Sequence, residues 1–195
     1  MVTEAIRAFI AIELPAELQD KLAAVIDEIQ KSAGRSVRWV TPRNIHLTLK
    51  FLGNVSPANL DSLTNVIKHE AIRYPSFSIG VGGLGAFPNK IRPRVIWVAV
   101  SAPGALAELQ RGIDRETNRL GYPGEDHAFS PHLTLGRVAQ HASPQSVKMV
   151  ADSLAALNVG ELGCAEVQTV QLFRSDLQPA GAIYTPLLKA PLAAG

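Results

Sequence analysis

The chain has 195 residues, of which 47% are hydrophobic and 18% are charged. This composition excludes a disordered chain, and the length predicts one domain, or two small lobes, stable without disulfides or metals. Lys and Arg number 19 against 17 Asp and Glu, and the resulting net charge of +2 neither indicates nor excludes RNA or a small anion as ligand.

The first half of the chain alternates strand and helix patterns. Residues 7–14 form an apolar run that Pro15 ends, which is typical of a buried strand. Pro15 opens a helix that continues through Lys31, and Gly34 is the expected stop. Further along, the patterns predict strands at 37–40 and 45–52, the latter ended by Gly53-Asn54, a helix from Ser56-Pro57 to before Pro75, and a strand at 77–84.

The second half follows the same order after a loop over residues 87–94. The patterns predict a strand at 95–100, a helix from Pro103 to about Leu120, a turn region at 121–126, a strand at 133–138, a helix from Pro144 to about Leu157, and strands at 166–173 and 183–188.

Three landmarks show that the two halves are an internal repeat. Pro15 and Pro103 are 88 residues apart (103 − 15), the tetrapeptide His-Leu-Thr-Leu at 46–49 returns 86 residues later at 132–135, and Ser56-Pro57 returns 87 residues later. We therefore expect a single domain, residues 1–195, with two pseudo-symmetric lobes from repeat units of about 6–85 and 94–188 and a cleft between them.

The lone cysteine, Cys164, excludes a disulfide framework and a thiolate zinc site. The apolar run at residues 8–12 is too short for a signal-peptide core or a membrane span. We expect a cytoplasmic protein that has no membrane partner.

The repeated His-Leu-Thr-Leu segments carry the chemistry. Because side chains alternate along a strand, His46 and Thr48 share one face, and so do His132 and Thr134. The leucines can seat each strand in the core while the polar pairs face the space between the lobes. If the twofold is real, two imidazoles and two hydroxyls converge on one point.

This set of groups fits phosphodiester chemistry. A neutral imidazole can take a proton from an attacking oxygen, and an imidazolium can give one to the leaving oxygen. The two threonine hydroxyls can donate to the non-bridging phosphate oxygens. The residues alone do not decide which histidine is the acid.

Two alternatives to a catalytic pair stay open. One His-Leu-Thr-Leu segment by itself is commonly just a β-prone tetrapeptide, an interpretation that two matched copies weaken. A zinc site would need a further ligand, for which His127 and His141 are candidates, but no H-E-x-x-H or thiolate pattern accompanies them. We expect no metal and no cofactor.

The sequence resembles the two-histidine (2H) phosphoesterases. His46-Leu-Thr-Leu-Lys-Phe-Leu-Gly and Ser130-Pro-His-Leu-Thr-Leu-Gly-Arg137 are similar to the paired motifs of that family. Arg7-Ala-Phe-Ile-Ala-Ile, Arg38-Trp-Val and Gly85-Ala-Phe-Pro88 narrow the resemblance to the RNA 2′,3′-cyclic phosphodiesterases, also called 2′-5′ RNA ligases. It covers about residues 5–188. Gly136, where the family often has alanine, is a departure that we expect to change little.

The resemblance implies a bilobal α+β fold in which two antiparallel sheets flank a central cleft, with helices outside. It implies a metal-independent enzyme that opens a 2′,3′-cyclic phosphate to a 2′-phosphomonoester, in some members with a reverse, ATP-independent 2′-5′ ligation. By resemblance, His46 is the proton donor to the leaving 3′-oxygen and His132 is the base that activates water. The implied substrate is an RNA end with a 2′,3′-cyclic phosphate, for example on a tRNA half, and we expect a monomer.

Other residues are candidates for binding the substrate. By resemblance Arg137 lies near the phosphate, where its charge would stabilise the transition state, with a surface salt bridge as the alternative. By alternation Lys50 continues the face of His46, or only borders the cleft. Four aromatic residues either stack on a base or belong to the core: Phe9, Trp39, Phe129 and Tyr184. A basic loop that either holds an RNA backbone or is simply solvated contains Lys90, Arg92 and Arg94.

Three functions are therefore open. The first is an enzyme acting on RNA ends. The second is a phosphodiesterase for a small cyclic nucleotide such as ADP-ribose 1″,2″-cyclic phosphate. The third is a non-catalytic RNA- or nucleotide-binding module, against which the intact histidines and threonines of both motifs argue.

Overall fold

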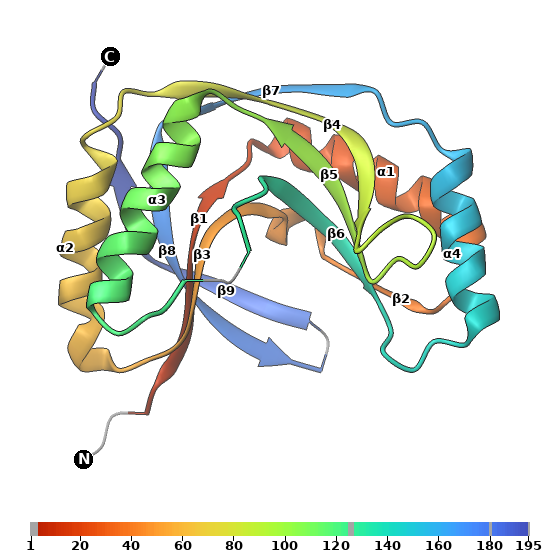
Figure 1. Cartoon of the computed structure of the whole chain (residues 1–195), viewed down its shortest axis with the longest axis horizontal. Helices are drawn as coiled ribbons and strands as arrows, with labels where there is room; N and C mark the ends of the chain where they lie inside the picture. The colour runs from red at the N-terminus through yellow and green to blue at the C-terminus, as the bar shows by residue number, and fades with distance from the viewer. Residues whose placement is uncertain (1–3, 125–126, 180, 195) are drawn as a thin grey trace.

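The computed structural model describes residues 4–124, 127–179 and 181–194 (Figure 1). Its α-helices are α1 (Ala16–Ala33), α2 (Leu60–Ala71), α3 (Gly104–Arg119) and α4 (Pro144–Ala156), and two short 3-10 turns are η1 (Pro42–Asn44) and η2 (Pro57–Asn59). Its strands are β1 (Ile6–Glu13), β2 (Val37–Trp39), β3 (His46–Val55), β4 (Phe77–Phe87), β5 (Val95–Ser101), β6 (His132–Val138), β7 (Glu161–Val167), β8 (Thr169–Gln178) and β9 (Gly181–Pro191).

All named strands belong to one antiparallel sheet with the order β7-β4-β5-β6-β3-β1-β8-β9, and β2 is added beside β6. Two halves of the sheet meet where β3 and β6 share one residue pair, Leu47 opposite Leu133. We call β3, β1, β8 and β9 the β3 half, and β6, β2, β5, β4 and β7 the β6 half. In Figure 1, α2 and α3 lie beside the β3 half, and α1 and α4 beside the β6 half. The expected α+β class is confirmed, with the two expected sheets joined into one curved sheet.

Neither half of the sheet is made from one repeat unit. β4, from the first repeat unit, pairs with β5 and β7 of the second. Conversely, β8 of the second repeat unit pairs with β1 of the first. The lobes are therefore not the repeat units of about 6–85 and 94–188, because each unit contributes strands to both halves.

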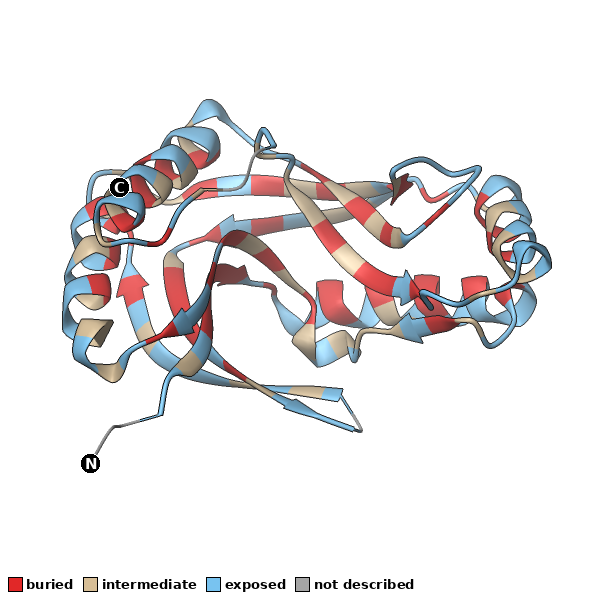
Figure 2. Ribbon diagram, turned by 60° about the horizontal axis from the view of Figure 1, so that its bottom comes forward, coloured by how far each residue is buried: buried red, intermediate tan, exposed pale blue. Residues whose placement is uncertain are grey.

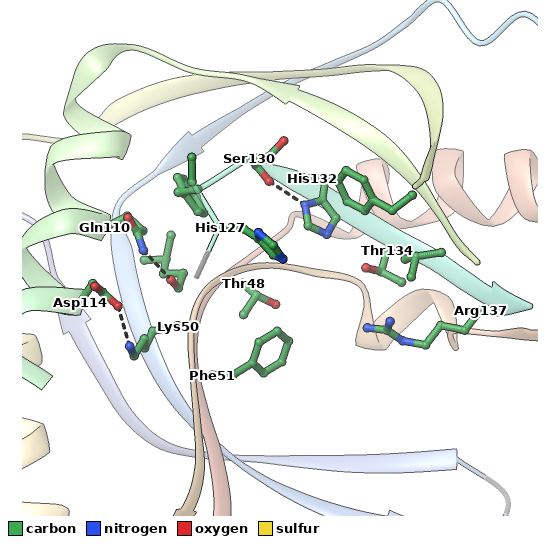
Figure 3. Close-up of a pocket in the computed structure, with 15 residues that line it drawn as sticks. Thr48, Lys50, Phe51, Gln110, Asp114, His127, Ser130, His132, Thr134 and Arg137 are labelled. Carbon is green, nitrogen blue, oxygen red and sulfur yellow. Dashed lines mark hydrogen bonds and ion pairs between the residues drawn. The ribbon is translucent and has the colours of Figure 1, made fainter. Parts of the chain in front are cut away.

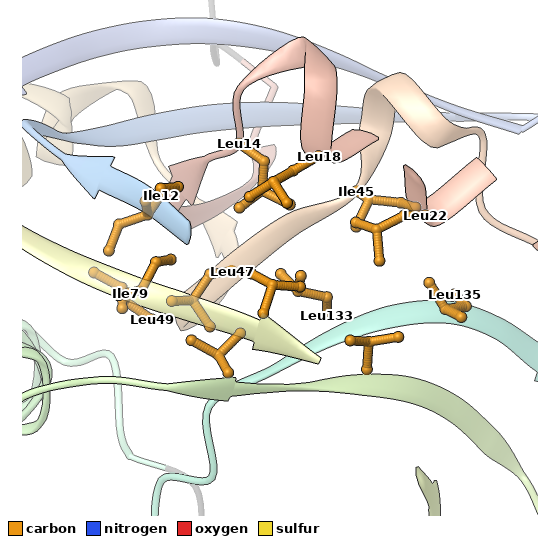
Figure 4. Packing of buried hydrophobic residues seen from close by; sticks show 14 of the residues in the cluster. Ile12, Leu14, Leu18, Leu22, Ile45, Leu47, Leu49, Ile79, Leu133 and Leu135 are labelled. Carbon is orange, nitrogen blue, oxygen red and sulfur yellow. The ribbon is translucent and has the colours of Figure 1, made fainter. Parts of the chain in front are cut away.

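The core runs through both halves without a break. On the inner faces of β3 and β6, Leu47, Leu49, Leu133 and Leu135 are buried, and they pack with residues of β1, β4 and α1 (Figure 4). Each helix has both buried and exposed residues along its length (Figure 2). None of the helices in the described part of the chain has the length and apolarity needed to cross a membrane.

The observed elements differ from the sequence prediction at a few places. The helix predicted at Ser56-Pro57 starts with the 3-10 turn η2, and α2 begins only at Leu60. β3 continues beyond Leu52 to Val55, since Gly53 adopts a positive φ of 68° at an irregularity in the pairing with β1.

The segment predicted as one strand at 166–173 is two strands, β7 and β8, which are separated at Gln168. The first part of β7 was missed because the strand lies at the edge of the sheet and buries only two of its seven residues. Such a strand lacks the apolar alternation that reveals a half-buried one.

We expect Leu47→Ala to lower the free energy of unfolding by about 2–5 kcal/mol, because the side chain is fully buried where the two halves meet. Ile72→Ala, at a residue that is 58% exposed, should change it by less than about 0.5 kcal/mol. Equilibrium unfolding in urea measures both. Equal values for the two variants would contradict the central place of Leu47 in the core.

Candidate active site

A β-bulge in β3 determines which of its side chains reach the cleft. Thr48 lies opposite Ala11 of β1, but Lys50 lies opposite the next residue, Ile10, so Leu49 is an extra residue in the ladder. Leu49 and Lys50 are consecutively buried, and alternation resumes one residue late. Phe51, half exposed, therefore shares the face of Thr48 and lines the cavity described below.

β6 repeats this bulge. Thr134 lies opposite Trp97 of β5, and Gly136 opposite the next residue, Ile96, so Leu135 is the extra residue. Arg137 then takes the place in β6 that Phe51 takes in β3, on the face of the histidine and threonine. One backbone arrangement thus presents a phenyl ring from one strand and a guanidinium from the other.

The bulge decides between the two expectations for Lys50, in favour of the one in which it only borders the cleft. Its side chain is 2% exposed, and its Nζ donates to Asp114 Oδ1 at 2.5 Å and to the Pro123 carbonyl at 2.7 Å. Gln110 Nε2, one turn before Asp114 on α3, donates to the carbonyl of the bulged Leu49 at 3.3 Å. Lys50 borders the cavity, but its charge is used inside the protein, where it ties β3 to α3 and the loop after it (Figure 3).

A cavity of about 710 Å³ lies between the two halves (Figure 3). β3 contributes Thr48 and Phe51, and β6 contributes His132, Thr134 and Arg137. Phe129 and His127 line it from the loop before β6. His46 is not part of this lining, although it lies two residues before Thr48 on the same face of β3. The structure therefore gathers most of the expected groups in one cavity and places His46 beside it.

The two histidines are held in the same way. His46 Nδ1 lies 2.7 Å from the Asn44 carbonyl, and His132 Nδ1 lies 2.6 Å from the Ser130 carbonyl. A carbonyl oxygen only accepts, so in each ring Nδ1 carries the hydrogen. In the neutral form, Nε2 then keeps its lone pair for a group outside the ring.

His46 lies among aromatic rings. Its ring stacks on Phe9 with centroids 4.6 Å apart and meets Tyr184 edge-on at 5.2 Å, and Phe173 lies at 6.5 Å. Burial lowers the pKa of His46, and the bond to the Asn44 carbonyl partly opposes this shift. Phe9 lies beneath His46 and is only 4% exposed. Of the two roles that the sequence left open for Phe9, stacking on a base or belonging to the core, the structure favours the second, because the buried ring supports the histidine.

Tyr184 also has a different position from the one expected of a base-stacking residue. It does not line the cavity, and its ring packs against Phe9 and His46. Burial raises the pKa of the Tyr184 hydroxyl, and the nearby charges of Arg137 and Arg7 oppose the shift. Of the four aromatic candidates, only Phe129 lines the cavity.

His132 is flanked by Phe87, edge-on at 5.0 Å, and by Trp97 at 6.2 Å. Trp39, from β2, packs on Gly136 outside the cavity. A Cβ on residue 136 would lie 2.8 Å from Trp39 Cε3. Gly136 therefore matters more than the sequence indicated, because alanine there would displace Trp39.

The remaining candidates lie away from the cavity. Lys90 and Arg92 are exposed on the loop before β5, and Arg94 Nη1 donates to the carbonyls of Ala139 and Gln140 at 3.4 and 3.5 Å. Within residues 4–124, 127–179 and 181–194 there is no group of three or more His, Cys, Asp or Glu placed to hold a metal. Arg137 forms no ion pair with any described residue, so the surface salt bridge considered as its alternative role is not seen there.

Phe51 is the site residue that the sequence interpretation missed. Strict alternation from His46 places Phe51 on the core face, and nothing in the sequence marks Leu49 as a bulge. The only signal was the matched spacing to Arg137 in the second motif, since both lie five residues after the histidine.

Comparisons with known proteins show what the chain is similar to. A family model described as LigT-like phosphoesterase matches residues 12–97 and again residues 98–184. The RNA 2′,3′-cyclic phosphodiesterase of Methanothermobacter thermautotrophicus is 38% identical over 93% of this chain and 96% of that protein. The protein of the same name from Thermotoga maritima is 31% identical over 97% of each.

Solved structures are similar over nearly the whole chain. A crystal structure of a protein from Thermus thermophilus matches with a TM-score of 0.80 at 29% identity, covering 96% of this chain and 98% of that one. Escherichia coli LigT complexed with 3′-AMP matches with a TM-score of 0.78 at 27% identity, covering 97% and 99%.

The buried ion pair should respond unequally to loss of its two partners. We expect Asp114→Ala to destabilise the protein by about 3–5 kcal/mol, because it leaves the buried Lys50 ammonium without a counter-charge. Lys50→Met should cost less, since the Asp114 side chain left behind is 32% exposed and retains water. Urea unfolding of the two variants gives the order, and a larger loss for Lys50→Met would contradict this account.

Proposed function

The chain belongs to the LigT-like phosphoesterase family, and from this premise we propose that it hydrolyses RNA 2′,3′-cyclic phosphate ends by acid–base catalysis between His46 and His132. It is a cyclic phosphodiesterase, the activity that the names of its relatives support. The observation that carries the proposal is that the two His-Leu-Thr-Leu strands meet at Leu47 and Leu133 with both histidines fixed through Nδ1.

The proposed reaction is an in-line displacement at phosphorus. His132 Nε2 takes a proton from water as the water oxygen bonds to phosphorus. The bond from phosphorus to the 3′-oxygen breaks, and His46 Nε2 gives its proton to that oxygen. The product is a 2′-phosphomonoester. We assign the two roles from the family resemblance, and the cross-cleft placement of the strands supports entry and departure on opposite sides.

Residues that line the cavity would stabilise the negative charge that develops on the phosphate oxygens. The hydroxyls of Thr48 and Thr134 would donate to the two non-bridging oxygens, and these bonds strengthen as charge builds. Arg137 would balance the negative charge from the β6 side. If a 5′-hydroxyl enters in place of water, the same displacement joins two RNA ends through a 2′-5′ linkage without ATP.

Phe51 and Arg137 give the cavity two chemically different sides. The half-exposed ring of Phe51 offers a stacking surface for a base, while Arg137 attracts phosphate. E. coli LigT has been crystallised with 3′-AMP, which fits a site of this kind for a nucleotide. We propose an RNA end as the substrate, with a small cyclic nucleotide as the second candidate.

An assay on defined RNA ends tests the proposal. A short RNA ending in 2′,3′-cyclic phosphate should be opened in the presence of EDTA, because the two imidazoles supply both proton transfers. The product should carry its phosphate on the 2′-oxygen, and an enzyme specific for 3′-phosphates should not remove it. Loss of turnover in EDTA with recovery in zinc would refute the metal-free mechanism, and 3′-phosphate ends would show that the substrate lies the other way round.

Substitution of the histidines tests their roles directly. His46→Ala and His132→Ala should each lower kcat by about 10²–10⁴-fold, the usual effect of one proton transfer. Thr48→Val and Thr134→Val should lower it by about 10–100-fold, the effect of one hydrogen bond to a charged group. His69→Ala, at an exposed position on α2, is the matched control and should turn over at the native rate. Near-normal turnover in either of the first two variants would remove that histidine from the mechanism.

A further inference from the structure

The hairpin formed by β8 and β9 holds the surroundings of His46 at two points. Asn44, whose carbonyl accepts from His46 Nδ1, also donates from its side-chain Nδ2 to the Ala182 carbonyl of β9 at 2.8 Å. Two residues further along β9, Tyr184 covers the flank of the His46 ring. The hairpin thus fixes the residue that holds the imidazole and also covers the imidazole itself.

The arrangement at His132 is different. Phe87 covers that ring from the side, but Ser130, whose carbonyl accepts from Nδ1, has no side-chain bond to another strand among the described residues. The neighbouring rings also differ, since Phe9 stacks on His46 at 4.6 Å whereas Trp97 is tilted against His132 at 6.2 Å. The two histidines therefore share a backbone pattern but not the contact with a hairpin.

The charged groups around His46 have other partners. Glu13, opposite His46 on β1, accepts from Gln171 Nε2 at 2.9 Å. Arg43, in η1, pairs with Asp20 of α1 at 2.8 Å. Tyr184 is the titratable residue of β9 in contact with the ring, and Arg7 and Arg137 lie within electrostatic reach of Tyr184. Aromatic cover and a carbonyl, rather than a charged partner, thus surround the imidazole.

We propose that the β8–β9 hairpin is a positioning element for His46. Through the bond that Ala182 accepts from Asn44, and through the ring of Tyr184, it keeps the imidazole out of contact with water and with its hydrogen on Nδ1 until an anionic substrate arrives. The inference rests on the proposed function, in which His46 delivers a proton from Nε2. The free enzyme then holds His46 neutral, and the ring takes up one proton from solvent when the negatively charged cyclic phosphate binds beside it. Asn44 and Tyr184 act through His46 and are positioning residues.

Histidine side-chain ¹H–¹⁵N spectra across a pH series test this without an activity measurement. Tyr184→Ala should raise the pKa of His46, because water then reaches the ring. Tyr184→Phe keeps the ring and should leave the titration as in the native protein. Ile183→Ala, at the exposed neighbouring position of β9, is the control for a general disturbance of the hairpin.

A second experiment measures the hydrolysis rate of a 2′,3′-cyclic nucleotide as a function of pH. The pH dependence of kcat/KM reports the free enzyme and that of kcat reports the complex, so the His46 limb should lie at lower pH in kcat/KM than in kcat. Tyr184→Ala should bring the two limbs together. Asn44→Ala removes the donor to Ala182 without adding a charge near His46, and it should lower kcat/KM about 2–10-fold, the effect of one neutral hydrogen bond.

The outcomes separate this inference from the function on which it rests. A His46 titration that is the same in Tyr184→Ala, Ile183→Ala and the native protein would overturn the positioning role while hydrolysis of cyclic phosphates stands. An upward shift in Tyr184→Ala alone, in a protein that opens no cyclic phosphate, would support the positioning role and refute the proposed function.

Discussion

The site depends on one junction in the sheet, where β3 and β6 meet through a single residue pair. Leu47 and Leu133 are both fully buried there, and each precedes a threonine and follows a histidine. Because strand side chains alternate, burying the two leucines turns the polar residues on either side to the opposite face. The burial of apolar surface thus orients the catalytic candidates, and the same contact joins the two halves of the protein. A shift of either strand by one residue would expose the leucines and bury the histidines.

The two bulges add a second level of organisation. Each bulge disrupts the regular pairing between neighbouring strands and changes the face on which the following side chain lies. The contacts made around the bulge differ between the two strands. In β3, α3 bonds the bulged carbonyl through Gln110, and Lys50 turns inward to Asp114. In β6, Gly136 occupies the position equivalent to Lys50, and Trp39 packs into the space that its missing side chain leaves. A repeated backbone therefore carries two different sets of supporting contacts.

The sequence predicted the parts of the site that obey simple periodicity. His46, Thr48, His132 and Thr134 stand out in the sequence because each pair keeps strict alternation and the motif occurs twice, and the structure places the last three in the cavity lining and His46 beside it. Periodicity fails where one extra residue reverses it. Alternation alone places Lys50 on the face of His46 and Phe51 on the core face, whereas Lys50 only borders the cavity and Phe51 lines it. The contact between Asn44 and Ala182 was beyond reach of any local pattern, because 138 residues separate its two partners. Phe9 and Tyr184 were noticed as aromatic residues, but only the fold shows that they surround a histidine.

The exchange of strands between the repeat units has a consequence for how the chain is made. β1 leaves the ribosome well before its partner β8, which begins only at Thr169. Until then one edge of β1 has no partner, and an open strand edge can pair with another chain. The aromatic surroundings of His46 are likewise complete only after β9 has been synthesised. Because so many of these pairings join distant parts of the sequence, folding should be slow, and truncated nascent chains should be prone to aggregation.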